Sequence, residues 1–342
     1  MTIEKMQKYL YDLPEQFSEM LNLRIVLPDR YKKDYRNIVV SGLGGSAIGG
    51  DILRSYALDR CQVPVLVNRD YVLPFFVNEF TLVLAVSYSG NTEETLSAYQ
   101  QARQRGADII AVSSGGKLSE LARNDGCLVV EVPGGMSPRA ASGYLFCPLA
   151  LILEEMDLLK GARLDLRETW QVLKELREEI NPAVAEDNNF ARQLAWKMKD
   201  CIPVIWGSSA HSDIAAIRWK AQINENAKAP AYYNAFPELD HNELVGFEAP
   251  AELLAKLLVI ILCDADDHEQ VKKRIRITGE IIREKVAGVI EIKTRGSSWL
   301  AKLYSLIYTG DYASFYLALE YGINPTPVKV IDYLKAELVR SI

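Results

Sequence analysis

The sequence predicts two doubly wound α/β domains, each a three-layer sandwich of a parallel sheet between helices, followed by a C-terminal helix. A length of 342 residues is enough for about two domains of typical size. Short β-branched runs alternate with helical segments, and apolar strands without polar alternation are buried on both faces of a parallel sheet. A strand, a Gly/Ser turn and a helix occur twice, as NIVVSGLGGSAIGGDILRS from Asn37 and as IPVIWGSSAHSDIAAIRWK from Ile202.

The elements are expected in a regular order. The segment MTIEKMQKYLYDLPEQ is predicted to form one amphipathic helix. Strands follow at residues 38–40, 63–67, 81–86, 108–112 and 128–132. The pattern is then helical and charged to about residue 190, and strands return at 202–206 and 257–263. We therefore expect a first domain with its N-terminal helix at 1–155, a helical connector at 156–190, and a second domain at 191–342.

Composition excludes several classes of partner. The formal net charge is -6 and the basic residues are scattered among carboxylates, which argues against nucleic-acid binding. The longest apolar stretches are too short to cross a membrane, and the N-terminus lacks the apolar region of a secretory signal, so a cytoplasmic protein is expected. The three histidines fall in no metal-ligand pattern, and we predict no metal. No C-x-x-C spacing joins the five cysteines, which favours reduced thiols: Cys61, Cys127, Cys147, Cys201 and Cys263.

Two hydroxyl-bearing loops follow strands of the first domain. In SGLGGS the glycines allow a tight turn that presents N–H groups at a helix start, and Ser46 adds a hydroxyl. The loop SYSGNTEET carries Ser87, Ser89 and Thr92, and helix capping readily explains only one of these. Parallel sheets bind ligands at the carboxyl ends of their strands, so the two loops predict a phosphate site there.

Other readings of these loops are weaker. Gly42, Gly44 and Ala47 satisfy the dinucleotide pattern G-x-G-x-x-A, but the candidate acidic partner, Asp70, lies further along the chain than that pattern requires. A P-loop is excluded because no Gly-Lys-Ser/Thr follows the turn. In the second domain the loop after the strand at 257–263 carries three carboxylates, which would repel a phosphate: Asp264, Asp266 and Asp267. An anion site is therefore expected in the first domain only.

The motifs SGLGGSAIGGD and VSYSGNTEET resemble those of the sugar isomerase (SIS) domain. The resemblance extends to the bifunctional phosphoglucose/phosphomannose isomerase family through MSPRAASG, INENAK, FPELDHNE and INPTPVKVIDYLK. It implies an enzyme without metal or cofactor that is usually a homodimer. It also implies that the loops bind the phosphate of a hexose phosphate through Gly45, Ser46, Ser87, Ser89 and Thr92.

The same resemblance implies four catalytic residues. Glu225 would carry the proton between C1 and C2, and Arg139 would stabilise the enediolate. His241 would open the sugar ring with Lys335. From the residues alone, Glu225 continues an apolar helical stripe, but its spacing favours an exposed glutamate paired with Lys228, and the resemblance reverses this preference.

Three points stay open beside this assignment. Lys329 competes with Lys335 for the lysine's role. Asp240 stands where some relatives are expected to have a second histidine, so its effect on the neighbouring histidine is undetermined. That histidine, His241, could act in its own subunit or across the dimer interface.

The predicted function is a metal-independent aldose-ketose isomerase acting on glucose 6-phosphate, mannose 6-phosphate or both, with fructose 6-phosphate as the ketose. A regulatory protein that binds a sugar phosphate without chemistry is one alternative. An amino-sugar phosphate isomerase is another, although no N-terminal cysteine glutaminase signature precedes the first loop. A dinucleotide-dependent dehydrogenase is the least favoured.

Overall fold

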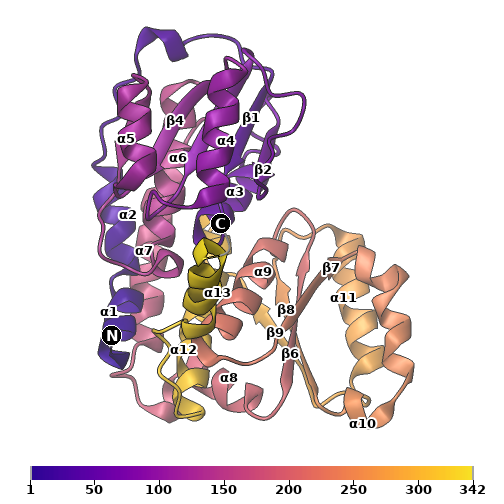
Figure 1. Ribbon diagram of the computed structural model, residues 1–342. Helices are drawn as coiled ribbons and strands as arrows, with labels where there is room; N and C mark the ends of the chain where they lie inside the picture. The colour runs from indigo at the N-terminus through magenta and orange to yellow at the C-terminus, as the bar shows by residue number, and fades with distance from the viewer. Residues whose placement is uncertain (1, 341–342) are drawn as a thin grey trace. The chain divides into compact units, whose positions relative to one another are not determined.

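The computed structural model describes residues 2–340 and divides into two compact units (Figure 1). The first unit consists of Asp12–Glu175 and Arg295–Ser305. The second unit consists of Leu176–Thr294 together with the segments up to Tyr11 and from Leu306 onward. Each unit is thus assembled from segments that are distant in the sequence. The domain boundaries predicted near residues 155 and 190 stay a proposal.

The first unit contains a five-stranded parallel sheet with the order β2-β1-β3-β4-β5. The strands are β1 (Asn37–Ser41), β2 (Val65–Asn68), β3 (Thr81–Val86), β4 (Asp108–Ser113) and β5 (Leu128–Glu131). The helices of this unit are α2 (Leu13–Leu21), α3 (Gly45–Tyr56), α4 (Glu93–Gln104), α5 (Gly116–Asn124) and α6 (Ser142–Glu155). All five predicted strands are confirmed, and each contains a short apolar run of the kind that strands of a parallel sheet carry.

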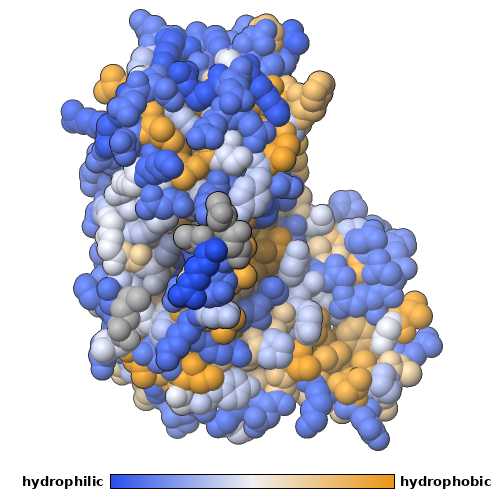
Figure 2. All heavy atoms as spheres, in the orientation of Figure 1, coloured by the Kyte–Doolittle hydropathy of each residue, from blue (hydrophilic) through white to orange (hydrophobic). Residues whose placement is uncertain are grey.

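Helices cover both faces of this sheet. Side chains of α4 and α5, among them Tyr99 and Leu118, share a buried cluster with Val83 of β3. On the other face Gly50 of α3 lies against Val40, and α3 also packs on α6. Figure 2 shows mainly hydrophilic side chains on the outer side of α4, as expected for a helix whose inner side is buried. The predicted three-layer sandwich is confirmed.

The second unit contains a four-stranded parallel sheet with the order β7-β6-β8-β9. Its strands are β6 (Ile202–Ser208), β7 (Tyr232–Phe236), β8 (Leu257–Cys263) and β9 (Gly288–Lys293). The shorter helices are α1 (Ile3–Tyr11), α8 (Phe190–Met198), α9 (Asp213–Gln222), α10 (Ala251–Leu254), α11 (Glu269–Ile282) and α13 (Lys329–Arg340). The central strands β6 and β8 match the prediction, whereas the edge strands β7 and β9 were not predicted.

Two long helices and several short turns complete the chain. The helix α7 (Ala162–Ile180) spans the break between the units at residue 175, and α12 (Trp299–Glu320) spans the break at residue 305. The short turns are η1 (Asp29–Tyr31), η2 (Pro138–Ala140), η3 (Glu186–Asn188), η4 (Ile223–Ala227), η5 (Glu238–His241) and η6 (Glu243–Glu248). Within residues 2–340 no helix is both long and apolar enough to span a membrane.

The prediction of one N-terminal helix was wrong. The segment forms two helices, α1 and α2, separated at Asp12. Pro14 lies in the first turn of α2, where its missing N–H costs nothing, but it could not continue α1 without breaking a hydrogen bond.

Both sheets have a point where the winding reverses. In the first sheet the chain goes from β1 through α3 to β2 on one side, and from β3 through α4 to β4 on the other. The reversal therefore lies between β1 and β3, and in the second sheet it lies between β6 and β8. Ligands of doubly wound sheets bind at the carboxyl ends of the strands at such a point.

Candidate active site

The first glycine loop lies at the reversal point of the first sheet. Gly44 has φ +53°, a conformation that a side chain would strain, and α3 begins at the next residue. Among residues 2–340, the N–H groups of Gly44 and Gly45 have no hydrogen-bond acceptor. Ser46 is buried in the first turn of α3. The loop therefore directs N–H donors and the positive end of α3 toward the same place.

The second loop brings two predicted hydroxyls together. The hydroxyls of Ser87 and Thr92 share a hydrogen bond of 2.8 Å. Thr92 occupies the N-cap position of α4 but makes no capping hydrogen bond. Ser89 is exposed, and its hydroxyl accepts a weak bond from the Asn91 N–H at 3.3 Å. Helix capping therefore does not account for these hydroxyls, although it was the main alternative to ligand binding.

A third segment packs against the first loop. Arg139 lies in η2 and is only 7% exposed. A Cβ added to Gly45 would lie 2.7 Å from the Pro138 carbonyl oxygen and 3.4 Å from the Arg139 Cα. The structure thus brings the main chain of Arg139 to the start of α3, and only glycine allows this approach. Within the first unit, all the predicted phosphate-binding residues and the arginine belong to neighbouring segments.

Glu225 occupies an unusual turn of the second unit. The expected continuous α-helix through this residue is not observed, because α9 ends at Gln222 and a π-helical turn, η4, follows. Turns of this type are frequent at functional sites. Glu225 is half-buried and lines a cavity of about 580 Å³.

Buried polar contacts to α12 hold α9 and this turn. Asp311 of α12 accepts hydrogen bonds from both Arg218 and Gln222 of α9, at 2.7–3.0 Å. The Asn226 amide, one residue after Glu225, donates to the Ser314 hydroxyl at 3.0 Å. Because these groups are buried, breaking any of the contacts would leave an unsatisfied polar group. The backbone that carries Glu225 is therefore firmly placed.

Two lysines other than the predicted one lie beside Glu225. The Lys228 ammonium donates to the main-chain carbonyl of Glu225 and, at 3.1 Å, to the carbonyl of Pro325. Lys329 lines the Glu225 cavity together with residues of the loop before α13. Lys335 is exposed on α13 and is not among the cavity's lining residues. The assignment of Lys335 stays a prediction, and the structure favours its competitor Lys329 as the lysine nearer to Glu225.

His241 ends the short helix η5 and is exposed. Its neighbour Asp240 is engaged elsewhere: its carboxylate accepts from Arg274 at 3.0 Å and from the Thr278 hydroxyl at 2.8 Å, both on α11. The Asp240 charge is therefore already paired by α11. The effect of Asp240 on the neighbouring histidine stays an open question.

The reversal point of the second sheet is closed by its own side chains. The Ser212 hydroxyl accepts from the Ser208 N–H at 2.9 Å and donates to the Leu262 carbonyl at 2.7 Å, bridging the ends of β6 and β8. The loop after β8 holds the buried carboxylates of Asp264 and Asp267. A bridged crevice beside buried acids is unsuited to a phosphate, in contrast to the loops of the first sheet.

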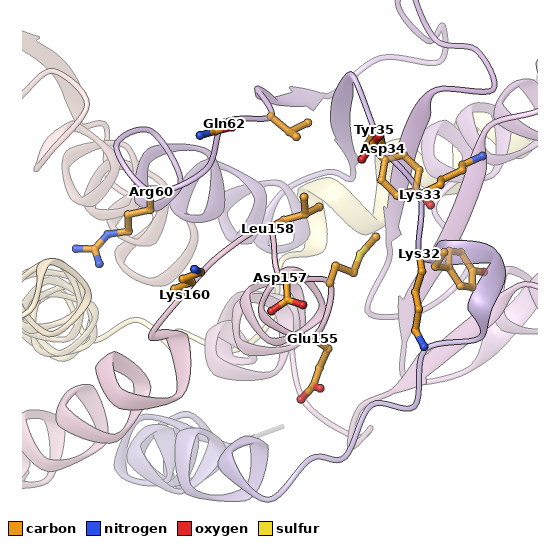
Figure 3. Close-up of a pocket in the computed structure, with 13 residues that line it drawn as sticks. Lys32, Lys33, Asp34, Tyr35, Arg60, Gln62, Glu155, Asp157, Leu158 and Lys160 are labelled. Atoms are coloured by element: carbon orange, nitrogen blue, oxygen red, sulfur yellow. The ribbon is translucent and has the colours of Figure 1, made fainter.

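A cavity of about 1070 Å³ lies at the opposite end of the first sheet, before β1 and β2 and beside the end of α6 (Figure 3). Figure 3 shows the acidic Glu155 and Asp157 among the basic side chains around it. Two of the basic groups also have acidic partners: Lys33 pairs with Asp108 at 2.6 Å, and Arg60 lies 3.5 Å from Asp165. The lining of this cavity therefore mixes charges of both signs, unlike the loops after β1 and β3.

Sequence reasoning missed three residues that place the predicted groups: Tyr88, Asn226 and Asp311. Tyr88 lies inside a recognised motif, but an aromatic residue between two serines is typical of a core position. The other two act through partners about 90 residues away in the chain. No local pattern could have identified such contacts.

Comparisons with known proteins show which family the chain resembles. A family model described as the bacterial phospho-glucose isomerase C-terminal SIS domain matches residues 187–338, and the SIS domain model matches residues 33–137. The chain is 48% identical over 330 residues to the bifunctional phosphoglucose/phosphomannose isomerase of Caldicellulosiruptor bescii, covering 96% of this chain and 97% of the relative. It is 39% identical to the enzyme of the same name from Aquifex aeolicus, covering 89% and 91%.

A solved structure shares the fold at low identity. The C-terminal domain of glucosamine-fructose-6-phosphate aminotransferase from Francisella tularensis superposes with a TM-score of 0.72 at 15% identity, covering 94% of this chain and 98% of that one.

Proposed function

Because the chain belongs to the family of bifunctional phosphoglucose/phosphomannose isomerases, we propose that it interconverts glucose 6-phosphate and mannose 6-phosphate with fructose 6-phosphate. The observation that carries the proposal is the hydroxyl pair of Ser87 and Thr92, which lies at a helix start without capping it. Such a pair, together with the N–H groups after β1, suits the phosphate of a sugar phosphate. The reaction would take place in the cytoplasm without metal or cofactor.

Phosphate binding would anchor the substrate in the first unit. The Gly45 N–H and four hydroxyls would donate hydrogen bonds to the phosphate oxygens, from Ser46, Ser87, Ser89 and Thr92. Hydrogen bonds to a charged acceptor are stronger than neutral ones, and the starts of α3 and α4 add partial positive charge. Arg139, whose backbone lies at the start of α3, would stabilise negative charge on the reacting oxygens.

Proton transfer would follow ring opening. His241, with Lys335 or Lys329, would protonate the ring oxygen and take the proton from the C1 hydroxyl, which leaves an open-chain aldehyde. Glu225 would remove the proton from C2 while O1 becomes the enediolate oxygen. Returning that proton to C1, while the O2 proton is transferred to O1, produces the C1 hydroxymethyl group and the C2 ketone of fructose 6-phosphate. Mannose 6-phosphate carries its C2 proton on the other face, so its reaction would require rotation about the C2–C3 bond.

We also propose that the protein is a homodimer and that His241 acts in the partner subunit's site. The exposure of His241 on η5 supports a role outside its own immediate surroundings. Mixed dimers of Glu225→Gln and His241→Asn chains would each contain one site with both native groups if the histidine crosses the interface. Partial recovery of activity on mixing is expected, and no recovery would favour action within one subunit.

The reaction itself is tested by supplying fructose 6-phosphate with EDTA and measuring glucose 6-phosphate and mannose 6-phosphate separately. Formation of both products is expected. Binding of fructose 6-phosphate without either product would instead favour a regulatory sugar-phosphate-binding protein. Turnover of only an amino-sugar phosphate would favour the amino-sugar isomerase.

The assignment of the base is tested by Glu225→Gln. General-base catalysis contributes about 10²- to 10⁴-fold, so kcat should fall by that factor while the Kd for fructose 6-phosphate changes little. Glu248→Gln, an exposed glutamate of the same unit, serves as the matched control and should retain full turnover. A Glu225→Gln enzyme with near-normal kcat would remove Glu225 from the mechanism.

A further inference from the structure

Tyr88 lies between two of the predicted phosphate-binding serines but faces away from solvent. Its side chain is 5% exposed. Its hydroxyl donates to the Pro133 carbonyl at 2.8 Å and accepts from the Met136 N–H at 3.2 Å. Its own carbonyl accepts from the N–H and the hydroxyl of Ser114, at 3.1 Å and 2.6 Å. The main chain of Tyr88 is thus bonded to the residue that follows β4, and its hydroxyl is bonded to the loop at residues 133–136.

The loop that Tyr88 contacts is the one that leads into Arg139. Met136 precedes η2 by two residues, so both hydrogen bonds of the Tyr88 hydroxyl lie on the approach to the arginine. The far side of η2 rests on Gly45, and the Gln16 amide donates to the Ala140 carbonyl at 2.8 Å. The arginine segment is therefore held at three points, and the Tyr88 contact connects it to the loop of Ser87 and Thr92.

This connection sets the spacing between two functional groups. In the proposed reaction the phosphate is on C6 and the reacting carbons are C1 and C2, so the anchor and Arg139 must engage opposite ends of one substrate. A displacement of about 1 Å from the productive geometry can cost on the order of 100-fold in rate. A rigid contact between the two loops would prevent such a displacement.

We infer that Tyr88 is a positioning residue that fixes Arg139 relative to the phosphate-binding loop. The inference rests on the proposed isomerase function for its catalytic consequence, but the contact itself is independent of it. Tyr88 touches neither the phosphate nor the reacting carbons. Its hydroxyl acts by holding residues 133–136 against the SYSGNT loop.

The first test is Tyr88→Phe, which keeps the ring and removes the two hydrogen bonds. We expect kcat to fall by about 10-fold or more, while the inhibition constant of inorganic phosphate stays at the wild-type value. Tyr99→Phe is the matched control, because Tyr99 is also buried in the first unit and its hydroxyl donates at 2.7 Å to Asp125, which follows α5. The control should lose stability without losing kcat.

A double-mutant cycle with Arg139→Ala separates positioning from a general structural effect. If Tyr88 acts through Arg139, removing its hydroxyl should change kcat little once the arginine is absent. Equal losses in both backgrounds, or a Tyr88→Phe enzyme with normal kcat, would overturn the inference while leaving the isomerase function intact.

Hydrogen exchange provides a readout that does not depend on turnover. Inorganic phosphate should slow amide exchange of residues 133–140 in the wild type and should not do so in Tyr88→Phe. If the wild type fails to isomerise fructose 6-phosphate, the proposed function fails, and this exchange experiment still decides the role of Tyr88. If phosphate protected residues 133–140 equally in the wild type and in Tyr88→Phe, the positioning role of Tyr88 would be refuted.

Discussion

Thr92 occupies the position from which a threonine ordinarily caps the following helix, yet its hydroxyl bonds to Ser87 instead. The first turn of α4 is therefore left with donors available at the place where the winding of the sheet reverses. Ser and Thr at such positions can serve either the helix or a ligand, and only the geometry distinguishes the two uses.

Removing either hydroxyl should weaken phosphate binding. Ser87→Ala and Thr92→Val each delete a donor to a charged ligand, which is worth about 1.5–3 kcal/mol, so KM for fructose 6-phosphate should rise about 10-fold or more. Ser97→Ala is the control, since Ser97 lies on the same helix but donates to the Tyr71 carbonyl. KM and the inhibition constant of inorganic phosphate would both be measured. If both stayed unchanged in Ser87→Ala and in Thr92→Val, the hydroxyl pair would have no role in phosphate binding.

Single residues differ in how far the sequence could predict them. The loop positions Ser46, Ser87, Ser89 and Thr92 follow from strand ends and turn residues, which are local features. Whether Lys329 or Lys335 accompanies Glu225 depends on how the loop before α13 folds back toward η4, and this fold is held by the long-range contact between Lys228 and Pro325. Local patterns contain no information on such a contact.

At the scale of elements, burial decides which strands could be predicted. The strands β3 and β8 are continuous apolar runs enclosed on both faces. The edge strand β7 begins with two exposed tyrosines, and β9 is only partly buried with Glu and Lys on its outer side. The exposed and charged residues of β7 and β9 interrupt the apolar run on which the prediction relied, whereas the edge strands β2 and β5 of the first sheet keep a short one.

The contact between α3 and η2 predicts a strong effect of a single methyl group. Gly45→Ala would place Cβ 2.7 Å from the Pro138 carbonyl oxygen, so the segment carrying Arg139 must move. We expect kcat/KM to fall at least about 10-fold, because overpacking here shifts both the phosphate loop and the arginine.

The control for this substitution is Gly279→Ala on α11. Its nearest neighbour would be Val289 Cγ1 at 4.0 Å, and alanine favours a helix, so neither activity nor stability should decrease. Wild-type kinetics of Gly45→Ala would show that the close approach of η2 has no functional role.

The start of α12 predicts a pH-dependent contribution to stability. Glu168 of α7 accepts from the N–H groups of Ser297 and Ser298, at 2.6 Å and 3.0 Å. Partial burial alone would raise the pKa of Glu168, but these hydrogen bonds outweigh it and leave the pKa below the ordinary value of 4.5. A lowered carboxyl pKa stabilises the folded state above the unfolded pKa, and the gain is lost as the pH falls through the folded pKa.

Glu168→Gln should therefore lower Tm at neutral pH, by about 2–4 °C for each kcal/mol lost, and the difference from wild type should shrink below about pH 4. Thermal unfolding followed by circular dichroism across this range measures it. Glu120→Gln, an exposed glutamate on α5, is the control and should show no such pH-dependent difference. A constant Tm difference at every pH would contradict the role assigned to the ionised carboxylate.

At the scale of the whole molecule, the two units are interleaved along the chain. The beginning of α12 completes the first unit, where Tyr304 packs edge-on against Phe17 with ring centroids 4.7 Å apart and also contacts Phe146 at 5.8 Å. In the second unit the Tyr308 hydroxyl donates to the carbonyl of Leu10, on α1, at 2.8 Å. Neither unit is a continuous stretch of sequence.

We therefore expect a fragment of residues 1–155 not to fold cooperatively. It would contain all five strands of the first sheet but would lack the buried residues Leu300, Ala301 and Tyr304. Loss of a large buried aromatic side chain alone costs about 3–5 kcal/mol, a large part of the stability of a domain. Urea unfolding of the fragment should show no sigmoidal transition. A cooperative transition would mean that the α12 residues are dispensable for this unit.

The division of α12 between the units also has a consequence during synthesis. A ribosome adds residues from the N-terminus, and the strands of the first sheet emerge within the first 131 residues. The side chains that complete their core, at 295–305, emerge only when nearly the whole chain of 342 residues has been translated. At translation rates of about 5–20 residues per second the nascent first sheet waits for roughly ten to thirty seconds with an incomplete core. During that interval it is a natural client for ribosome-associated chaperones.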